Sequence, residues 1–387
     1  MAFYWGNPIN WLLSYRHLTA FIYDTTDQKR AQWAQRQAER HGSDEFSFKR
    51  DDLPDEFSFI VLGDTGEGDS SQMVVVDKFL KEGADTAFSI IASDVIYPTG
   101  RSHAYREKFY VPYRGYKNDI YAVPGNHEWY DELTGFMIHF CDNMRDYTGQ
   151  RETTDKDKLE TLRVIRRNTY MQPNMYFYMD TKYVRIVFID TGIKGRIGDK
   201  QREWLRRISN DADQKPKILI SGKPIFVNGA FDDKLKDVNE IVNRFNYRLV
   251  IAGDTHNFQK YRIPISVDGQ RRIVWHLVNG GGGAYMNRTH TIPQARDMRF
   301  PRDLGIKLES EPSDFECYPS RKDSKALFGS WFLENAPDAL VDRDQPPYFK
   351  SFVKVKVQAD GLRVPVFGVK HFNEQILITE LVIPYHD

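Results

Sequence analysis

Short apolar runs alternate with amphipathic segments from residue 57 onward, and most of the runs end in Gly, Pro, Asp or Asn. This alternation predicts strands near residues 57–62, 87–92, 120–123, 217–220 and 248–252. Between and around them it predicts helices near residues 71–81, 104–113, 136–144, 199–209 and 233–245. Strands that alternate with helices indicate a layered α/β fold.

Further strands complete the predicted sheets, and two regions of the chain differ in character from the rest. The pattern also predicts hairpin and terminal strands over residues 176–179, 183–189, 258–267, 271–278, 352–357, 361–369 and 375–384. Residues 1–55 read as an N-terminal helical appendage, with helix expected over 26–41 and a charged linker after it. We therefore expect a main domain over 56–387 with an irregular polar insertion at about 296–350.

Composition and charge narrow the classes of partner. Lys plus Arg and Asp plus Glu number 54 each, so bulk charge indicates neither nucleic acid nor a membrane surface as partner. The two cysteines, Cys141 and Cys317, do not make a disulfide framework. No apolar stretch approaches the roughly 20 residues that span a bilayer. We expect a soluble, cytoplasmic protein, and the sequence does not indicate its oligomeric state.

Polar side chains with metal-ligand chemistry follow four of the apolar runs. They are Asp64, Asp94, Asn126 with His127 and Glu128, and His256. In open α/β sheets ligands collect at the carboxyl ends of the strands, so these side chains are expected to converge. Carboxylate, imidazole and carboxamide groups suit Fe, Mn and Zn. Two cations about 3.5–4 Å apart can share one carboxylate and activate water, and Asp94 is the best candidate for that bridge.

The ordered motifs resemble the calcineurin-like metallophosphoesterase superfamily over roughly residues 57–283. Gly125-Asn126-His127-Glu128 matches its GNH motif in full. Gly63-Asp64-Thr65-Gly66 departs from the usual DxH and is similar to the GDxG form of purple acid phosphatases. Those enzymes carry a tyrosine three residues after the second aspartate, and Tyr97 follows Asp94 at that spacing.

The resemblance implies a fold, a ligand set and a reaction. The fold is a four-layer α/β/β/α sandwich of two mixed sheets flanked by helices. Asp94 and Asn126 would contribute to a second metal, and His127 would contact phosphate and act as general acid toward the leaving oxygen. A first metal, for which the resemblance favours Fe(III), would be held by Asp64, Asp94, Tyr97 and His256.

Two departures from the family pattern fall on the second metal. Gly222 stands where the family usually has a lone histidine, and Asp254 replaces the first histidine of GHxH. Asp254 could still hold Mn or Mg together with Asp94, Asn126 and water. Alternatively, only the tyrosine-bearing site fills and Lys223 supplies a fixed positive charge, or the whole site is a metal-free relic.

The sequence therefore indicates a phosphatase or phosphodiesterase that uses a metal-bound hydroxide on a phosphorylated small molecule. Asp94 and His127 are its catalytic candidates, and His103, Lys223 and Asn228 are candidates for substrate binding. The alternative is a catalytically degraded or repurposed metal-binding module of the same fold. A lone iron with redox chemistry is a weaker third possibility, and the substrate itself stays open.

Overall fold

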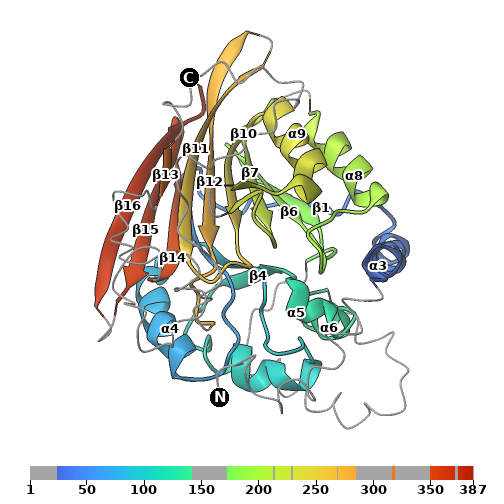
Figure 1. Ribbon diagram of the computed structural model, residues 1–387, viewed down its shortest axis with the longest axis vertical. Coiled ribbons are helices and arrows are strands. Elements are labelled where there is room, and N and C mark those ends of the chain that lie inside the picture. Colours follow the sequence, from blue (N-terminus) through green and yellow to red (C-terminus); the bar gives the residue numbers. More distant parts are fainter. Residues whose placement is uncertain are drawn as a thin grey trace.

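Two β-sheets stacked face to face make up the centre of the molecule (Figure 1). The computed structural model describes residues 24–141, 172–211, 214–227, 230–267, 269–284, 316–318, 349–370 and 374–386. The six-stranded sheet has the order β16 (Gln375–Pro384), β15 (Gly361–Val369), β14 (Lys350–Val357), β2 (Phe57–Leu62), β3 (Phe88–Ala92), β4 (Asp119–Val123). The eight-stranded sheet has the order β1 (Ser47–Lys49), β5 (Phe177–Asp180), β6 (Arg185–Ile189), β7 (Lys217–Ser221), β10 (Tyr247–Ala252), β12 (Gln270–Asn279), β11 (Phe258–Val267), β13 (Glu316–Tyr318).

Both sheets are mixed, with parallel strands next to the functional residues. β2, β3 and β4 run parallel, as do β6, β7, β10 and β12, while the remaining pairs are antiparallel except β1 with β5. Of the parallel strands, β3, β7 and β10 are buried along their full length, which explains why their sequences are largely continuous apolar runs. Because their carboxyl ends lie at one edge, the loops that follow them meet there.

Helices cover the outer faces of the two sheets. α4 (Ser70–Glu82) packs against β14 and β15 through Phe79, whose ring meets Phe352 edge-on. α8 (Asp199–Ser209) and α9 (Lys236–Arg244) pack together beside the eight-stranded sheet (Figure 1). The prediction of an α/β fold with two mixed sheets and flanking helices is confirmed.

Aromatic rings fill the space between the sheets. Phe177 stacks on Phe188 with ring centroids 4.2 Å apart, and both rings pack against Tyr121 of the other sheet. Burial of such large apolar side chains is the main force that holds the sheets together. A polar contact joins them as well, because Asn279 of β12 donates to the carbonyl of Val61, 3.2 Å away.

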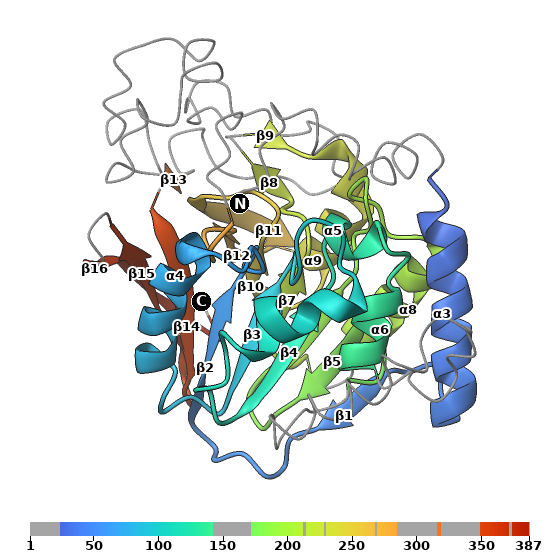
Figure 2. The ribbon, with the colours of Figure 1, turned by 90° about the horizontal axis from the view of Figure 1, so that it is seen from below.

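Several short elements complete the described chain. α5 (Asn126–Trp129) and α6 (Thr134–Phe140) follow β4 (Figure 2), and β8 (Phe226–Val227) pairs with β9 (Ala230–Phe231). A 3₁₀ turn (Ser102–Ala104) and a π-helical turn (Arg106–Tyr110) replace the regular helix expected over 104–113, and another 3₁₀ turn (Asp233–Leu235) precedes α9. Among the described residues, no helix is both long enough and apolar enough to cross a membrane.

The N-terminal region and the expected insertion are described only in part. α3 (Thr26–His41) is the helix expected for that stretch, and β1 lies inside the range expected to be a charged linker. Within the insertion, Glu316–Tyr318 form β13 at the edge of the eight-stranded sheet. Whether residues 1–55 form a separate appendage stays a prediction.

Candidate metal centre

The carboxyl ends of β2, β3 and β10 deliver the predicted metal ligands to one place. Asp64 follows β2, Asp94 follows β3, and His256 comes four residues after β10. The backbone of Asp64 and of Asp94 has a positive φ, 58° and 37°, which residues other than glycine seldom adopt. Unusual backbone of this kind clusters at functional sites, because the surrounding structure must hold it in place.

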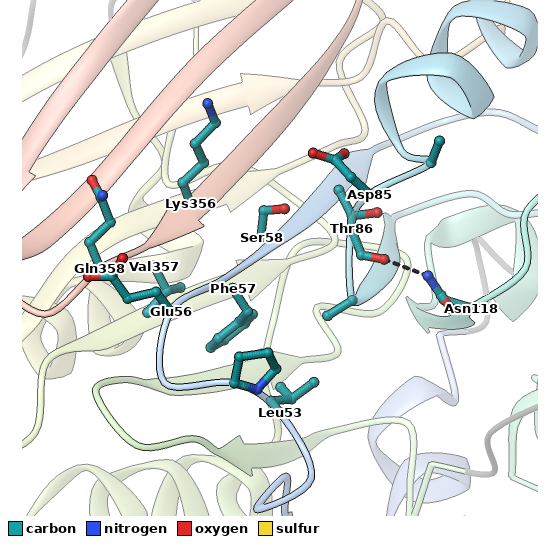
Figure 3. Close-up of a pocket in the computed structure, with 13 residues that line it drawn as sticks. Leu53, Glu56, Phe57, Ser58, Asp85, Thr86, Asn118, Lys356, Val357 and Gln358 are labelled. Atoms are coloured by element: carbon teal, nitrogen blue, oxygen red, sulfur yellow. Dashed lines mark hydrogen bonds between the residues drawn. The ribbon is translucent and has the colours of Figure 1, made fainter.

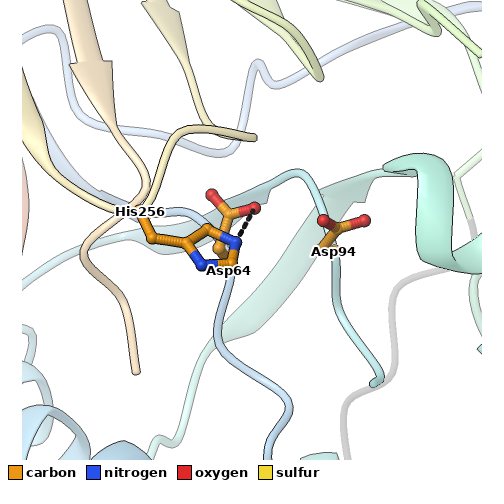
Figure 4. Close-up of side chains that lie close together, drawn as sticks. All are labelled: Asp64, Asp94 and His256. Atoms are coloured by element: carbon orange, nitrogen blue, oxygen red, sulfur yellow. Dashed lines mark ion pairs between the residues drawn. The ribbon is translucent and has the colours of Figure 1, made fainter. Parts of the chain in front are cut away.

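Asp64, Asp94 and His256 form a buried group of donors (Figure 4). One ligand atom from each lies within 4.8 Å of the others, and all three side chains are buried. Tyr97 completes the group, since its hydroxyl lies 3.0 Å from Asp94 Oδ2, 3.0 Å from His256 Nε2 and 3.3 Å from Asp64 Oδ1. The structure therefore brings together the four residues expected around the first metal.

The donor group fits a metal cation. The second carboxylate oxygen of Asp64, Oδ2, is buried and accepts no hydrogen bond from the described residues. Burial, and then the neighbouring carboxylates of Asp94 and Asp254, raise the pKa of Asp64 well above its usual range. A buried oxygen without a donor and two crowded carboxylates are costly unless a cation lies between them.

Glycine backbone closes against this group from the side of β12. A Cβ added at Gly280 would lie 2.6 Å from Asp64 Oδ2 and 2.1 Å from the carbonyl oxygen of Thr255. No side chain fits there, so glycine at this position allows the backbone to approach the site closely.

His127 lies beside the donor group with its ring orientation fixed. Its Nδ1 is 2.7 Å from the carbonyl oxygen of Pro98, and a carbonyl only accepts, so Nδ1 carries the proton. Its backbone amide donates to Asp94 Oδ1 at 3.0 Å, and its ring centroid is 4.2 Å from that of Tyr97. In the neutral ring Nε2 is therefore the nitrogen without a proton.

Glu128 holds the loops rather than adding a donor. Its buried carboxylate accepts from the backbone amides of Ile96, at 2.9 Å, and Gly125, at 2.8 Å. It thereby ties the loop after β3 to the loop after β4.

At the position expected for a second metal, the protein has an ion pair and a glycine instead of two histidines. Lys223 forms an ion pair and a hydrogen bond with Asp254, and their side chains are 19% and 21% exposed. A Cβ added at Gly222 would lie 2.8 Å from Thr191 Oγ1 and 3.0 Å from the carbonyl oxygen of Pro124. The backbone thus leaves little room for the histidine that the family usually carries at this position.

The remaining candidates are less closely connected to the donor group. Asn126 donates from Nδ2 to the hydroxyl of Tyr130, 2.7 Å away. His103 is exposed on the 3₁₀ turn after the Asp94 loop. Asn228 lies outside the described residues. Roles for these three in metal or substrate binding stay predictions.

The sequence reasoning missed a buried network next to the site. Asp190, at the end of β6, accepts from Trp129 Nε1 at 2.9 Å and from Arg30 Nε at 2.6 Å. Asp190 follows an apolar run just as Asp64 and Asp94 do, so the same signal would have found it. Its role differs because an arginine and a tryptophan satisfy its carboxylate.

A pocket at the other end of the same strands lacks comparable chemistry (Figure 3). It measures about 680 Å³ and is lined where β2 and β3 begin, by residues that include Phe57, Ser58 and Ala87. Its carboxylate Asp85 is paired with Lys354, 2.6 Å away. The donor group is therefore the stronger candidate for a functional site.

Comparisons with known proteins agree with this geometry. The family described as Calcineurin-like phosphoesterase matches residues 57–258. Of the solved structures, GAP50, the anchor in the inner membrane complex of Plasmodium, aligns with TM-score 0.50 and 12% identity over 86% of this chain and 89% of its own. The purple acid phosphatase PPD1 from yellow lupin seeds aligns with TM-score 0.50 and 11% identity over 86% of this chain and 54% of its own.

At such low identity the two structures support the fold alone, and no curated protein matches the chain. The family match covers more than half of the sequence and includes the loops that carry Asp64, Asp94, His127 and His256. The chain belongs to the calcineurin-like phosphoesterase family.

Proposed function

We propose that this protein is a metal-dependent phosphoester hydrolase. The observation that carries the proposal is the buried group of Asp64, Asp94, Tyr97 and His256, in which Asp64 Oδ2 has no donor among the described residues. These four side chains would hold the metal. A bound cation supplies a water of lowered pKa and polarises a phosphoryl oxygen.

The roles of the surrounding residues follow from their contacts. Asp94 contacts both Tyr97 and the backbone of His127, so it fixes the metal side and the proton-transfer side relative to each other. His127 holds a proton on Nδ1 against Pro98, so the doubly protonated ring would donate its second proton, from Nε2, to the departing ester oxygen and become neutral. General acid catalysis of this kind contributes about 10²–10⁴-fold to the rate.

The identity of the metal is a finer part of the proposal. A phenolate ligand is expected to favour Fe(III), and Tyr97 Oη lies within 3.3 Å of ligand atoms of the three other donors. Protein that contains iron should absorb visible light through a Tyr97–Fe(III) bond, and Tyr97→Phe should lose this absorption. A colourless protein that contains zinc or manganese would contradict the assignment of iron while keeping a hydrolytic centre.

Paired substitutions test the proposal itself. Asp64→Asn should remove most of the metal and reduce hydrolysis of an aryl phosphate at least 10²-fold, because it replaces a buried anionic ligand. His127→Ala should retain the metal and slow turnover by about 10²–10⁴-fold. Metal content by elemental analysis and kcat on aryl phosphate mono- and diesters are the measurements, with exposed His386→Ala as control. Full turnover in His127→Ala would refute the role of His127.

A second candidate function is a metal-binding module without turnover. Both imidazoles expected around the second metal are replaced, by Gly222 and Asp254, and Asp254 is paired with Lys223. GAP50, which shares the fold, is described as the anchor in the inner membrane complex of Plasmodium. Stoichiometric metal without hydrolysis of any aryl phosphate would favour this candidate.

A further inference from the structure

Lys223 is placed beside the donor group by contacts along its whole length. Its backbone amide donates to Thr191 Oγ1 at 2.9 Å, and its carbonyl accepts from Ser221 Oγ at 2.8 Å. A Cβ added at Gly195 would lie 3.2 Å from Lys223 Cδ, so the alkyl chain runs closely over that glycine. Lys223 is thus an anchored side chain rather than a solvated one.

The ammonium of Lys223 lies in the field of the site's carboxylates. It bonds directly to Asp254, whose own backbone amide donates to Asp64 Oδ1 at 3.1 Å. A lysine ammonium is charged at neutral pH by its ordinary chemistry, and the ion pair with Asp254 favours the charged form. The ammonium is therefore a permanent positive charge at neutral pH.

A second metal would have to compete with this charge. Asp254 is the carboxylate expected to replace one histidine, and its interaction with Lys223 already neutralises it. Gly222 has no side chain that could bind a metal. The backbone carbonyl of Pro124 leaves little space for a larger residue at this position. The donor set at this position does not fit a second cation.

We propose that the ammonium of Lys223 takes the place of the second metal, so that the centre holds one metal ion and Lys223 binds a phosphoryl oxygen of the ligand. The inference rests on the proposed function, because it assumes that the first position holds a metal. An ammonium has three donors, of which Asp254 engages one, and lysine binds phosphate as a point charge.

The test combines metal counting with phosphate binding. Wild-type protein is loaded with excess Mn²⁺, freed of unbound metal and analysed for metal content, and its affinity for inorganic phosphate is measured by calorimetry. We expect one equivalent of metal in the wild type and in Lys223→Met, with phosphate binding weakened at least tenfold in the variant. Lys223→Arg should recover part of the affinity, since it restores a positive charge, and exposed Lys236→Met should match the wild type.

Each outcome decides a different point. Two equivalents of metal in the wild type, or unchanged phosphate affinity in Lys223→Met, would overturn the inference and leave the proposed function standing. No bound metal in the wild type would overturn the proposed function and this inference with it. If Lys223→Met fails to fold because Asp254 is left unpaired, the double variant with Asp254→Asn removes both charges and gives the same readout.

Discussion

At the scale of single residues, His276 is an uncharged histidine in an apolar setting. It lies on β12, its ring centroid is 4.8 Å from that of Phe226, and neither ring nitrogen has a hydrogen-bond partner among the described residues. Burial lowers the pKa of His276 to about 3, because the charged form would lose its hydration. In the unfolded chain the same ring titrates near its ordinary pKa of about 6.5.

The consequence is a loss of stability in acid. Below about pH 6.5 the unfolded state binds a proton that the folded state does not, so the free energy of unfolding should fall by about 2 kcal/mol between pH 7 and pH 5 from this group. His276→Leu should lack this component in urea unfolding at the two pH values, whereas exposed His386→Leu should keep it. An identical pH dependence in His276→Leu and wild type would show that the ring takes up a proton in the folded protein as readily as in the unfolded chain.

The metal donors were more predictable from sequence than the pairing of Lys223. Asp64, Asp94 and His256 each follow an apolar run, and strand polarity alone brings such residues to one edge. The ion pair of Lys223 with Asp254 depends on how two loops lie side by side. No sequence pattern predicts how two loops pack, so the sequence alone could not decide between a second metal at Asp254 and a fixed charge from Lys223.

At the scale of elements, α3 supports the segment that follows the GNH motif. Arg30 pairs with Asp190, which also accepts from Trp129 of α5, and the two charged side chains are 3% and 0% exposed. Farther along α3, Gln37 donates to the carbonyl of Cys141 at 3.3 Å, just after α6. The helix thus braces both ends of the α5–α6 segment.

We expect this brace to make a large contribution to stability. Arg30→Met should lower the free energy of unfolding by about 3–5 kcal/mol, because it leaves the Asp190 carboxylate buried without its cation. Arg202→Met breaks the more exposed pair with Asp237 and should cost less than about 1 kcal/mol. Urea unfolding measures both, and equal effects of the two substitutions would contradict the importance of burial.

Strands could be predicted from the sequence where complete burial requires an uninterrupted run of apolar residues. β3, β7 and β10 are buried along their full length and stand out as apolar runs. β1 has an alternating, largely exposed sequence of only three residues, Ser47–Lys49, and β13 is equally short. These strands depend on pairing with β5 and β11, which the local sequence does not encode.

At the scale of the whole molecule, the donor group connects the two sheets. Asp64 and Asp94 follow strands of the six-stranded sheet, and His256 follows β10 of the eight-stranded sheet. A cation bound by all three would stabilise the stacked arrangement, by about 2.7 kcal/mol at a free concentration one hundred times its Kd. Metal should therefore act on global stability as well as on the proposed hydrolysis.

Thermal unfolding with and without metal measures this link. Protein stripped by a chelator should melt at a lower temperature than the loaded protein, and Asp64→Asn should show little difference between the two conditions. Equal melting temperatures for stripped and loaded wild type, with metal shown to be bound, would mean that the cation binds folded and unfolded chains alike.

The amide of Ser351 donates to the carbonyl of Gly281 at 3.0 Å, so the chain leaves β12 and returns to β14 at nearly the same point. Closing a loop becomes only slowly more costly as the loop lengthens. The length of the chain between these two residues can therefore change with little effect on the register of β12 and β14. The stretch begins beside Gly280, where an added Cβ would lie 2.6 Å from Asp64 Oδ2, so a change in its length starts next to the donor group while β12 and β14 keep their places.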